Sequence, residues 1–400
     1  MSETVVLAYS GGLDTSVAVR WLAENRGFEV VTLTVDLGSQ PNLQLIERKA
    51  LASGARRAVV ADLRQEFVER YCWSALRAGA LYQGRYPLAT ALGRPLIARR
   101  LVELAHLEGA AWVAHGSTAK GNDQVRFEVA IRALDPELQV TAPMREGMSM
   151  TREQEIIYAQ EHGIPVPVTL GSPYSIDENL WGRSVEAGAL EDPTVEPPVD
   201  AFAWTRQVAD TPTDPEYLEI SFEQGVPVSL DGGPADSVAI VDSLNQRAGA
   251  HGVGRIDMIE NRFIGIKSRE IYEAPAATVL HLAHQALEDL VLDSETAQFN
   301  ELVSHEYARL VYQGKWYSAQ RRHLDAYVAS SQRLVGGSVR VKLHRGTAQV
   351  VGRTSPSSLY RPSLATYSEG DQFDHATARG FIEIVGLPLR VQSAVQGVEP

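Results

Sequence analysis

The string SGGLDTS at residues 10–16 restricts the fold of this chain more than any other feature of its sequence. It follows an apolar, β-branched run at 4–9 (TVVLAY), which is typical of a strand buried on both faces of a parallel sheet. It precedes a helical pattern that ends at Gly27 and whose apolar face comprises Val17, Ala18, Trp21 and Leu22. The sequence therefore predicts a strand, a tight turn and a helix, which is the repeating unit of an α/β domain.

The residues of this turn are suited to binding an anion. Gly11 and Gly12 have no side chains, so the backbone can turn sharply and approach a ligand closely. The start of the following helix offers unpaired N–H groups and the positive end of the helix dipole. Hydroxyl donors are added by Ser10, Thr15 and Ser16. We therefore predict a phosphate site in which Asp14 either holds Mg²⁺ or caps the helix. The GxxxxGK[ST] string of a Walker loop is absent.

Strand and helix patterns alternate along the first part of the chain. Further strands are expected at 29–35, 57–61 and 111–115, and helices at 43–52, 64–82, 95–107 and 152–162. This alternation predicts a doubly wound parallel-sheet domain of the α/β class over residues 1–168.

The pattern changes in the second part. A proline-rich segment at 191–215 indicates an extended crossing. After it we expect paired strands at 217–230, further strands at 256–267 and 338–353, and helices at 236–250, 275–313 and 318–334. Elements that do not alternate one for one favour an α+β domain, which we place at residues 169–372. Residues 373–400 are expected to form a C-terminal helical arm used in oligomerisation.

Composition excludes several classes of protein. The net charge is −13 and no Lys/Arg-rich run is present, so a nucleic-acid partner is not expected. No apolar stretch is long enough to span a membrane, and the N-terminus lacks the features of a secretory signal, so we expect a cytoplasmic protein. The single cysteine, Cys72, rules out an internal disulfide, and packing on a helix is the favoured role for it.

A second polar string, HGSTAKGNDQVRFE at 115–128, follows a predicted strand. Ligands bind at the carboxyl ends of strands in open α/β sheets. The string supplies four different polar groups within nine residues, namely those of Thr118, Asn122, Asp123 and Arg126. An arginine can pair with a carboxylate and an aspartate with an ammonium group, so this set can hold a zwitterionic amino acid.

These strings carry a resemblance to known families. SGGLDTS resembles the PP-loop, SGGxDS, of the N-type ATP pyrophosphatases, which implies a HUP-like nucleotide-binding fold. Together with HGSTAKGNDQVRFE, the chain is similar in order and spacing to the argininosuccinate synthase family over nearly its whole length. The other matching strings are QGRYPLAT (83–90), GRPLIA (93–98), SPYSIDENLWGRS (172–184), ALEDP (189–193), IENRFIGIKSREIYEAPAA (259–277) and KWYS (315–318).

The resemblance implies a ligase of arginine biosynthesis. Such an enzyme joins L-citrulline and L-aspartate through a citrullyl-AMP intermediate and converts ATP into AMP and pyrophosphate. The resemblance also implies a homotetramer with small-molecule substrates, and Mg²⁺ is expected because the charge of ATP needs neutralising.

Site residues follow from the matching positions. ATP would be bound by Ala8, Tyr9, Ser10, Gly11, Gly12, Leu13, Asp14, Thr15, Ser16, Val35 and Gly116. Aspartate would be bound by Thr118, Asn122 and Asp123. Citrulline would be bound by Tyr86, Thr90, Asn122, Arg126, Ser175, Ser184, Glu260 and Tyr272. The chain departs from the family in having Val35 in place of alanine and Ala91 in place of a serine, for which Thr90 is the nearest hydroxyl.

Several assignments stay open at this point. Asp123 can recognise the aspartate ammonium or act as a general base, and the adenylate phosphate is an alternative base. His115 can line the nucleotide site or serve as an oriented structural residue. Candidates for neutralising the ATP phosphates are Arg94, Arg99 and Lys120. A metal bound by His281 and His284 is disfavoured, because no third ligand has suitable spacing.

Two other functions remain as alternatives. A tRNA-thiolating enzyme shares the PP-loop but needs reactive cysteines and a basic surface. A non-catalytic ATP-binding module would leave the second domain without a role. Binding of citrulline distinguishes this second alternative from a ligase.

Overall fold

The computed structural model describes residues 2–38, 42–118, 121–148, 150–165 and 174–397. It contains two compact units, Met1–Ser357 and Ser358–Pro400. The expected border between the first two domains, at 168 and 169, lies outside the described residues. Within the described ranges, every helix is too short or too polar to cross a lipid bilayer.

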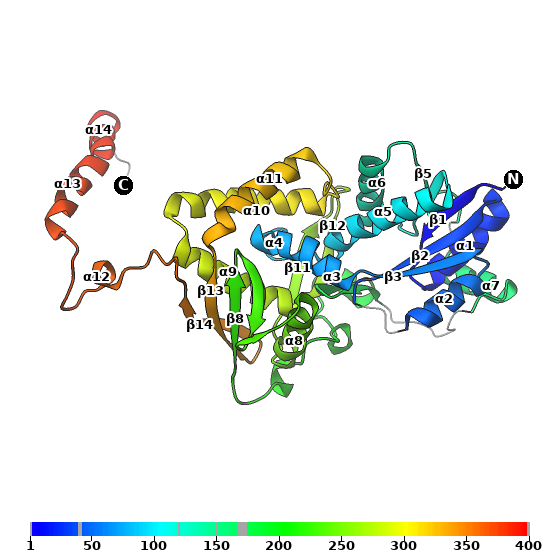
Figure 1. The fold of residues 1–400 in the computed structure, drawn as a ribbon, viewed down its shortest axis with the longest axis horizontal. Coiled ribbons are helices and arrows are strands. Elements are labelled where there is room, and N and C mark those ends of the chain that lie inside the picture. Colours follow the sequence, from blue (N-terminus) through cyan, green and yellow to red (C-terminus); the bar gives the residue numbers. More distant parts are fainter. Residues whose placement is uncertain (1, 39–41, 119–120, 149, 166–173, 398–400) are drawn as a thin grey trace. The chain divides into compact units, whose positions relative to one another are not determined.

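The first part of the larger unit is built on a five-stranded parallel sheet with the strand order β3-β2-β1-β4-β5 (Figure 1). Its strands are β1 (Thr4–Ala8), β2 (Glu29–Asp36), β3 (Arg57–Asp62), β4 (Trp112–Ala114) and β5 (Gln139–Thr141). Its helices are α1 (Leu13–Arg26), α2 (Leu43–Ala52), α5 (Ala89–Glu108), α6 (Asp123–Leu134) and α7 (Arg152–Glu161). The predicted parallel sheet is therefore confirmed, with β5 as a strand that was not expected.

Alternate residues of β1 face opposite layers, as the two-residue period of a strand requires. Val5 and Leu7 share an apolar cluster with residues of α1, α2 and α7. Val6 shares a second cluster with residues of α5 and α6. Helices thus cover both faces of the sheet, which confirms the doubly wound arrangement.

Two helices differ from their predicted limits. The helix expected at 64–82 consists of α3 (Arg64–Glu66), a π-helical turn (Phe67–Cys72) and α4 (Trp73–Arg77). The helix expected to start at Pro95 begins six residues earlier and contains that proline, because its buried face extends back to Ala89. Proline disfavours a helix interior, so burial outweighs local preference here.

The remainder of the larger unit contains two antiparallel sheets. One has the order β10-β9-β8-β13-β14 and comprises β8 (Glu216–Glu223), β9 (Val226–Leu230), β10 (Gly233–Pro234), β13 (Gly337–His344) and β14 (Thr347–Thr354). The other has the order β11-β12-β7-β6 and comprises β6 (Ser175–Asn179), β7 (Gly182–Glu186), β11 (Arg255–Asn261) and β12 (Lys267–Glu273). The helices are α8 (Ser237–Ala250), α9 (Pro275–Val291), α10 (Ser294–Tyr312) and α11 (Ala319–Ser331). The expected α+β character is confirmed.

Two expected elements are divided by local signals. The helix predicted at 275–313 ends at Val291, and Asp293 caps α10 by accepting a hydrogen bond from the Thr296 N–H at 3.0 Å. The strand predicted at 256–267 is a hairpin that turns near Gly265, whose φ is +92°. The proline-rich segment follows a 3₁₀ turn at Gly188–Glu191 and contains only two further short 3₁₀ turns, Val199–Ala201 and Val208–Asp210, in agreement with an extended crossing.

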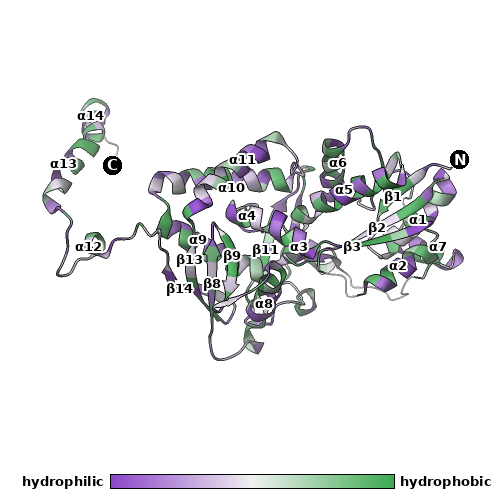
Figure 2. Ribbon diagram, viewed as in Figure 1, coloured by the Kyte–Doolittle hydropathy of each residue, from purple (hydrophilic) through white to green (hydrophobic). Residues whose placement is uncertain are grey.

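The smaller unit consists of α12 (Pro362–Ala365), α13 (His375–Val385) and α14 (Leu387–Gln396). Figure 2 shows hydrophobic residues on both of the longer helices. Their exposed apolar side chains include Phe381, Ile382, Ile384, Leu389 and Val391. The helical character expected after residue 373 is confirmed.

Candidate functional site

The site lies where the strand order of the parallel sheet reverses. β1 and β4 are neighbours, and the helices that follow them, α1 and α6, pack on opposite faces of the sheet. The loops after the two strands therefore diverge and leave a crevice at their carboxyl ends. A cavity of about 390 Å³ lies here. Its lining includes six predicted ATP residues: Ala8, Tyr9, Ser10, Thr15, Val35 and Gly116.

The glycine loop, residues 10–12, leads into helix α1, whose first turn has no side-chain cap. Gly12 is the N-cap of α1, with φ −77° and ψ 177°, and no side chain caps the helix there. Asp14 lies in the first turn instead, so the alternative that it caps the helix is wrong. Gly11 has a φ of +79°, a conformation that side-chain-bearing residues rarely adopt. The backbone N–H groups at the start of α1 thus stay available for an anion.

Hydroxyl groups fix the shape of this loop. The Ser10 and Thr15 hydroxyls lie 3.1 Å apart. Ser16 Oγ donates to the Gly12 carbonyl at 2.7 Å and lies 2.8 Å from the Tyr9 hydroxyl. Ser16 is buried and supports the loop, and Leu13 is the first residue of α1.

The loops after β1 and β4 meet across the cavity. A Cβ atom on Gly116 would lie 2.9 Å from Thr15 Cγ2, so a larger residue here would displace the Thr15 side chain. The His115 side chain is fully buried and lines the cavity. Its Nδ1 accepts a hydrogen bond from the Ser117 N–H at 3.3 Å, and its Nε2 lies 3.6 Å from Glu128 Oε1. His115 thus both lines the site and is held in one orientation.

The two arginines that were candidates for neutralising the ATP phosphates form ion pairs with carboxylates of the protein. Arg94 lines the cavity, but its guanidinium pairs with Asp123 at 2.7 Å and also with Asp177. Arg99 pairs with Glu66. Lys120 lies outside the described residues. A cation that was not predicted from the sequence lies at the glycine loop: Lys49 of α2, whose Nζ donates to the Gly11 carbonyl at 3.3 Å.

A second cavity, of about 140 Å³, adjoins the first. It is lined by every residue predicted to bind citrulline: Tyr86, Thr90, Asn122, Arg126, Ser175, Ser184, Glu260 and Tyr272. Asp123, Ser175 and Asp177 line both cavities and form a common wall. Thr118 lines only the larger cavity. The structure thus brings together residues from α5, α6, β6, β7, β11 and β12.

The common wall carries a network of opposite charges. Asp123 lies between Arg94 and Arg126, whose nearest nitrogens are at 2.7 and 2.9 Å. Burial alone would raise the pKa of Asp123, but the two guanidinium groups outweigh it and lower the pKa to about 2. Burial raises the pKa of Asp177, which Arg94 offsets only in part. Asp123 is therefore ionised at neutral pH.

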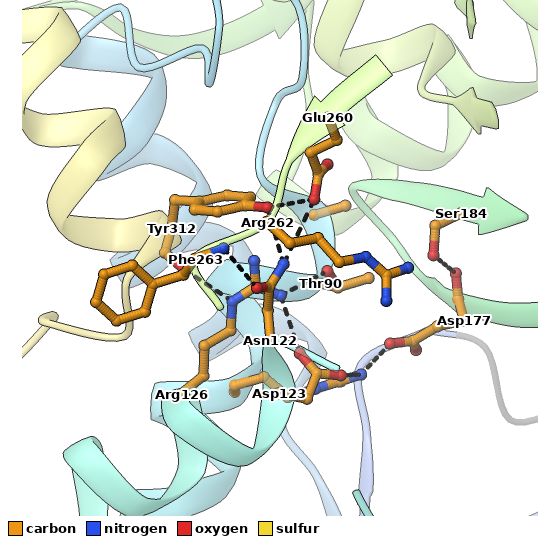
Figure 3. Close-up of polar contacts among 12 residues, drawn as sticks. Thr90, Asn122, Asp123, Arg126, Asp177, Ser184, Glu260, Arg262, Phe263 and Tyr312 are labelled. Atoms are coloured by element: carbon orange, nitrogen blue, oxygen red, sulfur yellow. Dashed lines mark hydrogen bonds and ion pairs between the residues drawn. The ribbon is translucent and has the colours of Figure 1, made fainter. Parts of the chain in front are cut away.

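At the centre of the smaller cavity is a buried carboxylate. Glu260 is only 3% exposed and accepts hydrogen bonds from the hydroxyls of Tyr272 and Tyr312. Asn122 Nδ2 donates to the Tyr312 hydroxyl at 2.8 Å, and Asn122 Oδ1 accepts from the Phe263 N–H at 2.9 Å (Figure 3). Because buried polar groups are costly unless paired, this network fixes the amide orientation of Asn122.

Thr90 also faces the smaller cavity. Its hydroxyl lies 2.7 Å from the Tyr86 hydroxyl and accepts a hydrogen bond from Arg126 Nη1 at 3.4 Å. Ala91 is fully buried and does not line the cavity. Thr90 is therefore the hydroxyl available at this position.

The smaller cavity also contains a charged group, Arg262, that was not predicted from the sequence. Arg262 pairs with Glu186 and, at 2.7 Å, with Glu270. Burial and the neighbouring carboxylate of Glu186 raise the pKa of Glu270 to about 8. Asp177 and Arg262 both lie in strings that carried the family resemblance, so their position was visible in the sequence but their partners were not.

The remaining candidates play no part in this site. Cys72 is fully buried, which raises the pKa of its thiol well above the usual value and agrees with a packing role. His284 bonds Gln332 Oε1 at 2.8 Å. In the part of the chain that the structure describes, no group of three or more His, Cys, Asp or Glu side chains could hold a metal ion.

Comparison with known proteins matches both parts of the chain to the same family. Residues 4–165 match the family model described as the arginosuccinate synthase N-terminal HUP domain, and residues 174–392 match the arginosuccinate synthase C-terminal domain. A curated protein of Gloeobacter violaceus named argininosuccinate synthase is 57% identical, with 99% of each chain covered. A protein of the same name from Dehalococcoides mccartyi is 54% identical, covering 100% of this chain and 98% of that protein.

Among solved structures, a predicted subunit of a tRNA methyltransferase from Methanocaldococcus jannaschii is similar over 40% of this chain and 75% of its own. The TM-score is 0.27 and the sequence identity is 15%.

Proposed function

This chain belongs to the argininosuccinate synthase family, and from this premise we propose that the two adjoining cavities carry out its ligation reaction in sequence. ATP occupies the larger cavity with its terminal phosphates on the glycine loop, held by the residues of the 8–16 segment together with Val35 and Gly116. Citrulline occupies the smaller cavity. The observation that carries this proposal is the common wall of Asp123, Ser175 and Asp177.

The first step activates citrulline. Its ureido carbon is a poor electrophile because the adjacent nitrogens donate electron density into it. The ureido oxygen attacks the α-phosphorus of ATP, the bond to the β-phosphate oxygen breaks, and pyrophosphate leaves on the glycine loop. N–H groups at the start of α1 stabilise the charge of the departing pyrophosphate. The product is citrullyl-AMP, whose ureido carbon now bears a good leaving group.

The second step forms the C–N bond. The amine of aspartate, bound by Thr118, Asn122 and Asp123, attacks the activated carbon, and AMP leaves with the former ureido oxygen. The low pKa of Asp123 makes it a weak base, so we assign it to recognition of the aspartate ammonium. Before the attack, the ammonium group gives one proton to a phosphate oxygen of citrullyl-AMP, so the amine has a free electron pair and AMP leaves carrying that proton.

Oxygen labelling tests this sequence. With citrulline carrying ¹⁸O in the ureido group, we expect one label per AMP formed, because the ureido oxygen stays on the phosphorus. Mass spectrometry of AMP and pyrophosphate measures the label. Unlabelled AMP would contradict the adenylate mechanism, and ATP binding without any effect of citrulline would favour a non-catalytic nucleotide-binding module.

We also propose that Asp14 and Glu155 hold Mg²⁺. Glu155, on α7, is buried, and its Oε1 has no hydrogen-bond partner among the described residues. Burial and the nearby Asp14 carboxylate raise the pKa of Glu155 to about 8. Mg²⁺ commonly binds one or two carboxylates together with substrate phosphates, so this pair fits the ion. When bound, the ion neutralises charge on the ATP polyphosphate.

The magnesium assignment predicts a shifted metal requirement. Asp14→Asn removes one charged ligand, so the Mg²⁺ concentration for half-maximal ATP binding should rise about tenfold or more. Calorimetric titration of ATP at several Mg²⁺ concentrations measures this shift. Glu153→Gln, an exposed change on α7, is the control. An unaltered requirement in Asp14→Asn would contradict the assignment.

Three further features are proposed from the family membership. The protein is cytoplasmic, and it is a homotetramer in which the C-terminal arm (373–400) contributes to oligomerisation. Exposed apolar side chains on α13 and α14 support this role of the arm. The chain before the arm is divided into an ATP-binding domain, 1–168, and a synthetase domain, 169–372.

A further inference from the structure

Tyr312, the last residue of α10, lies outside the strings that carried the family resemblance and is not part of the lining of either cavity. We propose that Tyr312 is a positioning residue that holds Asn122, Arg126 and Glu260 in the geometry that binds citrulline. This inference rests on the proposed function of the smaller cavity and adds to it a group behind the binding residues.

The hydroxyl of Tyr312 connects two of these side chains. It donates to Glu260 Oε1 and accepts from Asn122 Nδ2 at 2.8 Å. Tyr312 is 1% exposed, so water does not replace either partner. One buried O–H group thus sets the position of the carboxylate and the rotation of the amide at the same time.

The backbone and ring of Tyr312 hold the third side chain. Its carbonyl oxygen accepts a hydrogen bond from Arg126 Nε at 3.0 Å. The Arg126 guanidinium carbon lies 4.9 Å from the centre of the Tyr312 ring, within the range of a cation–π contact. The arginine is therefore held from two directions, and its Nη1 is directed to Thr90 and Asp123.

The ring itself is fixed by its neighbours. Tyr82 stacks on it, with ring centres 3.5 Å apart and planes inclined by 4°. Two residues further on, Gly314 allows the chain to pass so close to α6 that a Cβ atom would lie 2.7 Å from Arg126 Cα. The end of α10 is thereby locked against the helix that carries Asn122 and Arg126 as N-cap and first-turn residues.

Removal of the hydroxyl alone separates positioning from packing. Tyr312→Phe keeps the ring stack, the cation–π contact and the carbonyl acceptor. It leaves Glu260 without one donor and Asn122 without one acceptor in a buried site, which is unfavourable. Glu260 then keeps its bond from Tyr272, and Asn122 keeps Phe263 and its longer contact of 3.4 Å with Glu260, so the two side chains are held less firmly in the citrulline-binding geometry.

We expect Tyr312→Phe to raise the KM for citrulline about tenfold or more, with the KM for ATP changed less than about twofold. The matched control is Tyr307→Phe on the same helix. Tyr307 is also fully buried, and its hydroxyl donates to Asp325 at 2.9 Å, away from both cavities. We expect the control to lower the melting temperature while the citrulline KM stays unchanged.

A double-mutant cycle identifies the route of the effect. If Tyr312 acts through the carboxylate, Tyr312→Phe should add little to the defect of Glu260→Gln, because contacting residues are not additive. Tyr82→Leu, which removes the ring stack and leaves the hydroxyl, should raise the citrulline KM in the same direction. It serves as the second variant if Tyr312→Phe does not fold.

Three results overturn the inference: an unchanged citrulline KM in Tyr312→Phe, equal changes in the KM for citrulline and ATP, or full additivity with Glu260→Gln. If Tyr312→Phe does not fold, an unchanged citrulline KM in Tyr82→Leu overturns it. Failure of the proposed function is seen separately, as a wild-type protein that releases no pyrophosphate when citrulline is added to ATP.

Discussion

Replacement of Asp123 by asparagine is expected to lower kcat/KM for aspartate at least about 100-fold, because the bound ammonium group loses a buried carboxylate partner, which costs about 2–5 kcal/mol of binding free energy. The carboxylate lies between Arg94 and Arg126, and the asparagine would leave Arg94 with Asp177 alone and Arg126 without its carboxylate partner. An incoming ammonium group would then meet excess positive charge. Steady-state kinetics with aspartate varied at saturating citrulline and ATP measure the effect.

The same variant should still bind ATP. ATP binding depends on the glycine loop, so its dissociation constant should change little. Asp135→Asn is the control, because Asp135 lies at the other end of α6 and pairs with exposed His106. Loss of ATP binding in Asp123→Asn, or unchanged use of aspartate, would show that the carboxylate has a different role.

The pKa of Asp123, about 2, adds a pH test. A carboxyl group with so low a pKa stays ionised at every pH at which the folded enzyme is assayed. Acidification from pH 8 to pH 5 should therefore not weaken aspartate binding through this residue.

The second large effect is expected for Gly12→Ala. The φ of −77° is open to alanine, and the added Cβ would contact only Ser10 Oγ, at 3.4 Å. The variant should therefore fold with an unchanged melting temperature. The methyl group nevertheless covers the start of α1, where the phosphates approach the N–H groups. We expect the KM for ATP to rise about 100-fold, since several charge-assisted hydrogen bonds of about 1.5–3 kcal/mol each are weakened.

Gly12 is a cleaner test than Gly11. At Gly11 the φ of +79° and a Cβ only 3.1 Å from Ile46 Cγ1 would strain the backbone of any variant, so lost ATP binding would have two causes. Gly352→Ala is the control, since Gly352 lies on β14 and its Cβ would meet only ordinary contact with Arg340 Cβ at 3.8 Å. Normal ATP kinetics in Gly12→Ala would show that the glycine loop does not bind the phosphates of ATP.

The parallel sheet could be predicted because its central strands are continuous apolar runs. β1 and β2 are almost wholly buried, and their apolar residues indicate this burial directly in the sequence. β5 has three residues, one of them exposed glutamine, and gives no such signal. β6 and β7 are rich in polar residues because they line the site, so their strand character was hidden.

The binding side chains themselves were found by resemblance, whereas their partners were not. Arg94 stood in a matching string, yet its role depends on Asp123 and Asp177, 29 and 83 residues away. Tyr312 acts through residues 190 and 52 positions away. Contacts over such separations follow from the packing of two domains, which no local pattern in a single sequence contains.

The partition shared by the two cavities has a consequence for fidelity. Water can also attack the activated carbon of citrullyl-AMP, and each intermediate that is hydrolysed in this way consumes one ATP without forming product. Since Asp123, one of the residues that receive the amine, lies in this partition, the nucleophile is bound beside the ureido carbon before that carbon is activated. Without aspartate, the consumption of ATP should therefore be slow. With aspartate present, the ratio of ATP consumed to argininosuccinate formed should stay close to one.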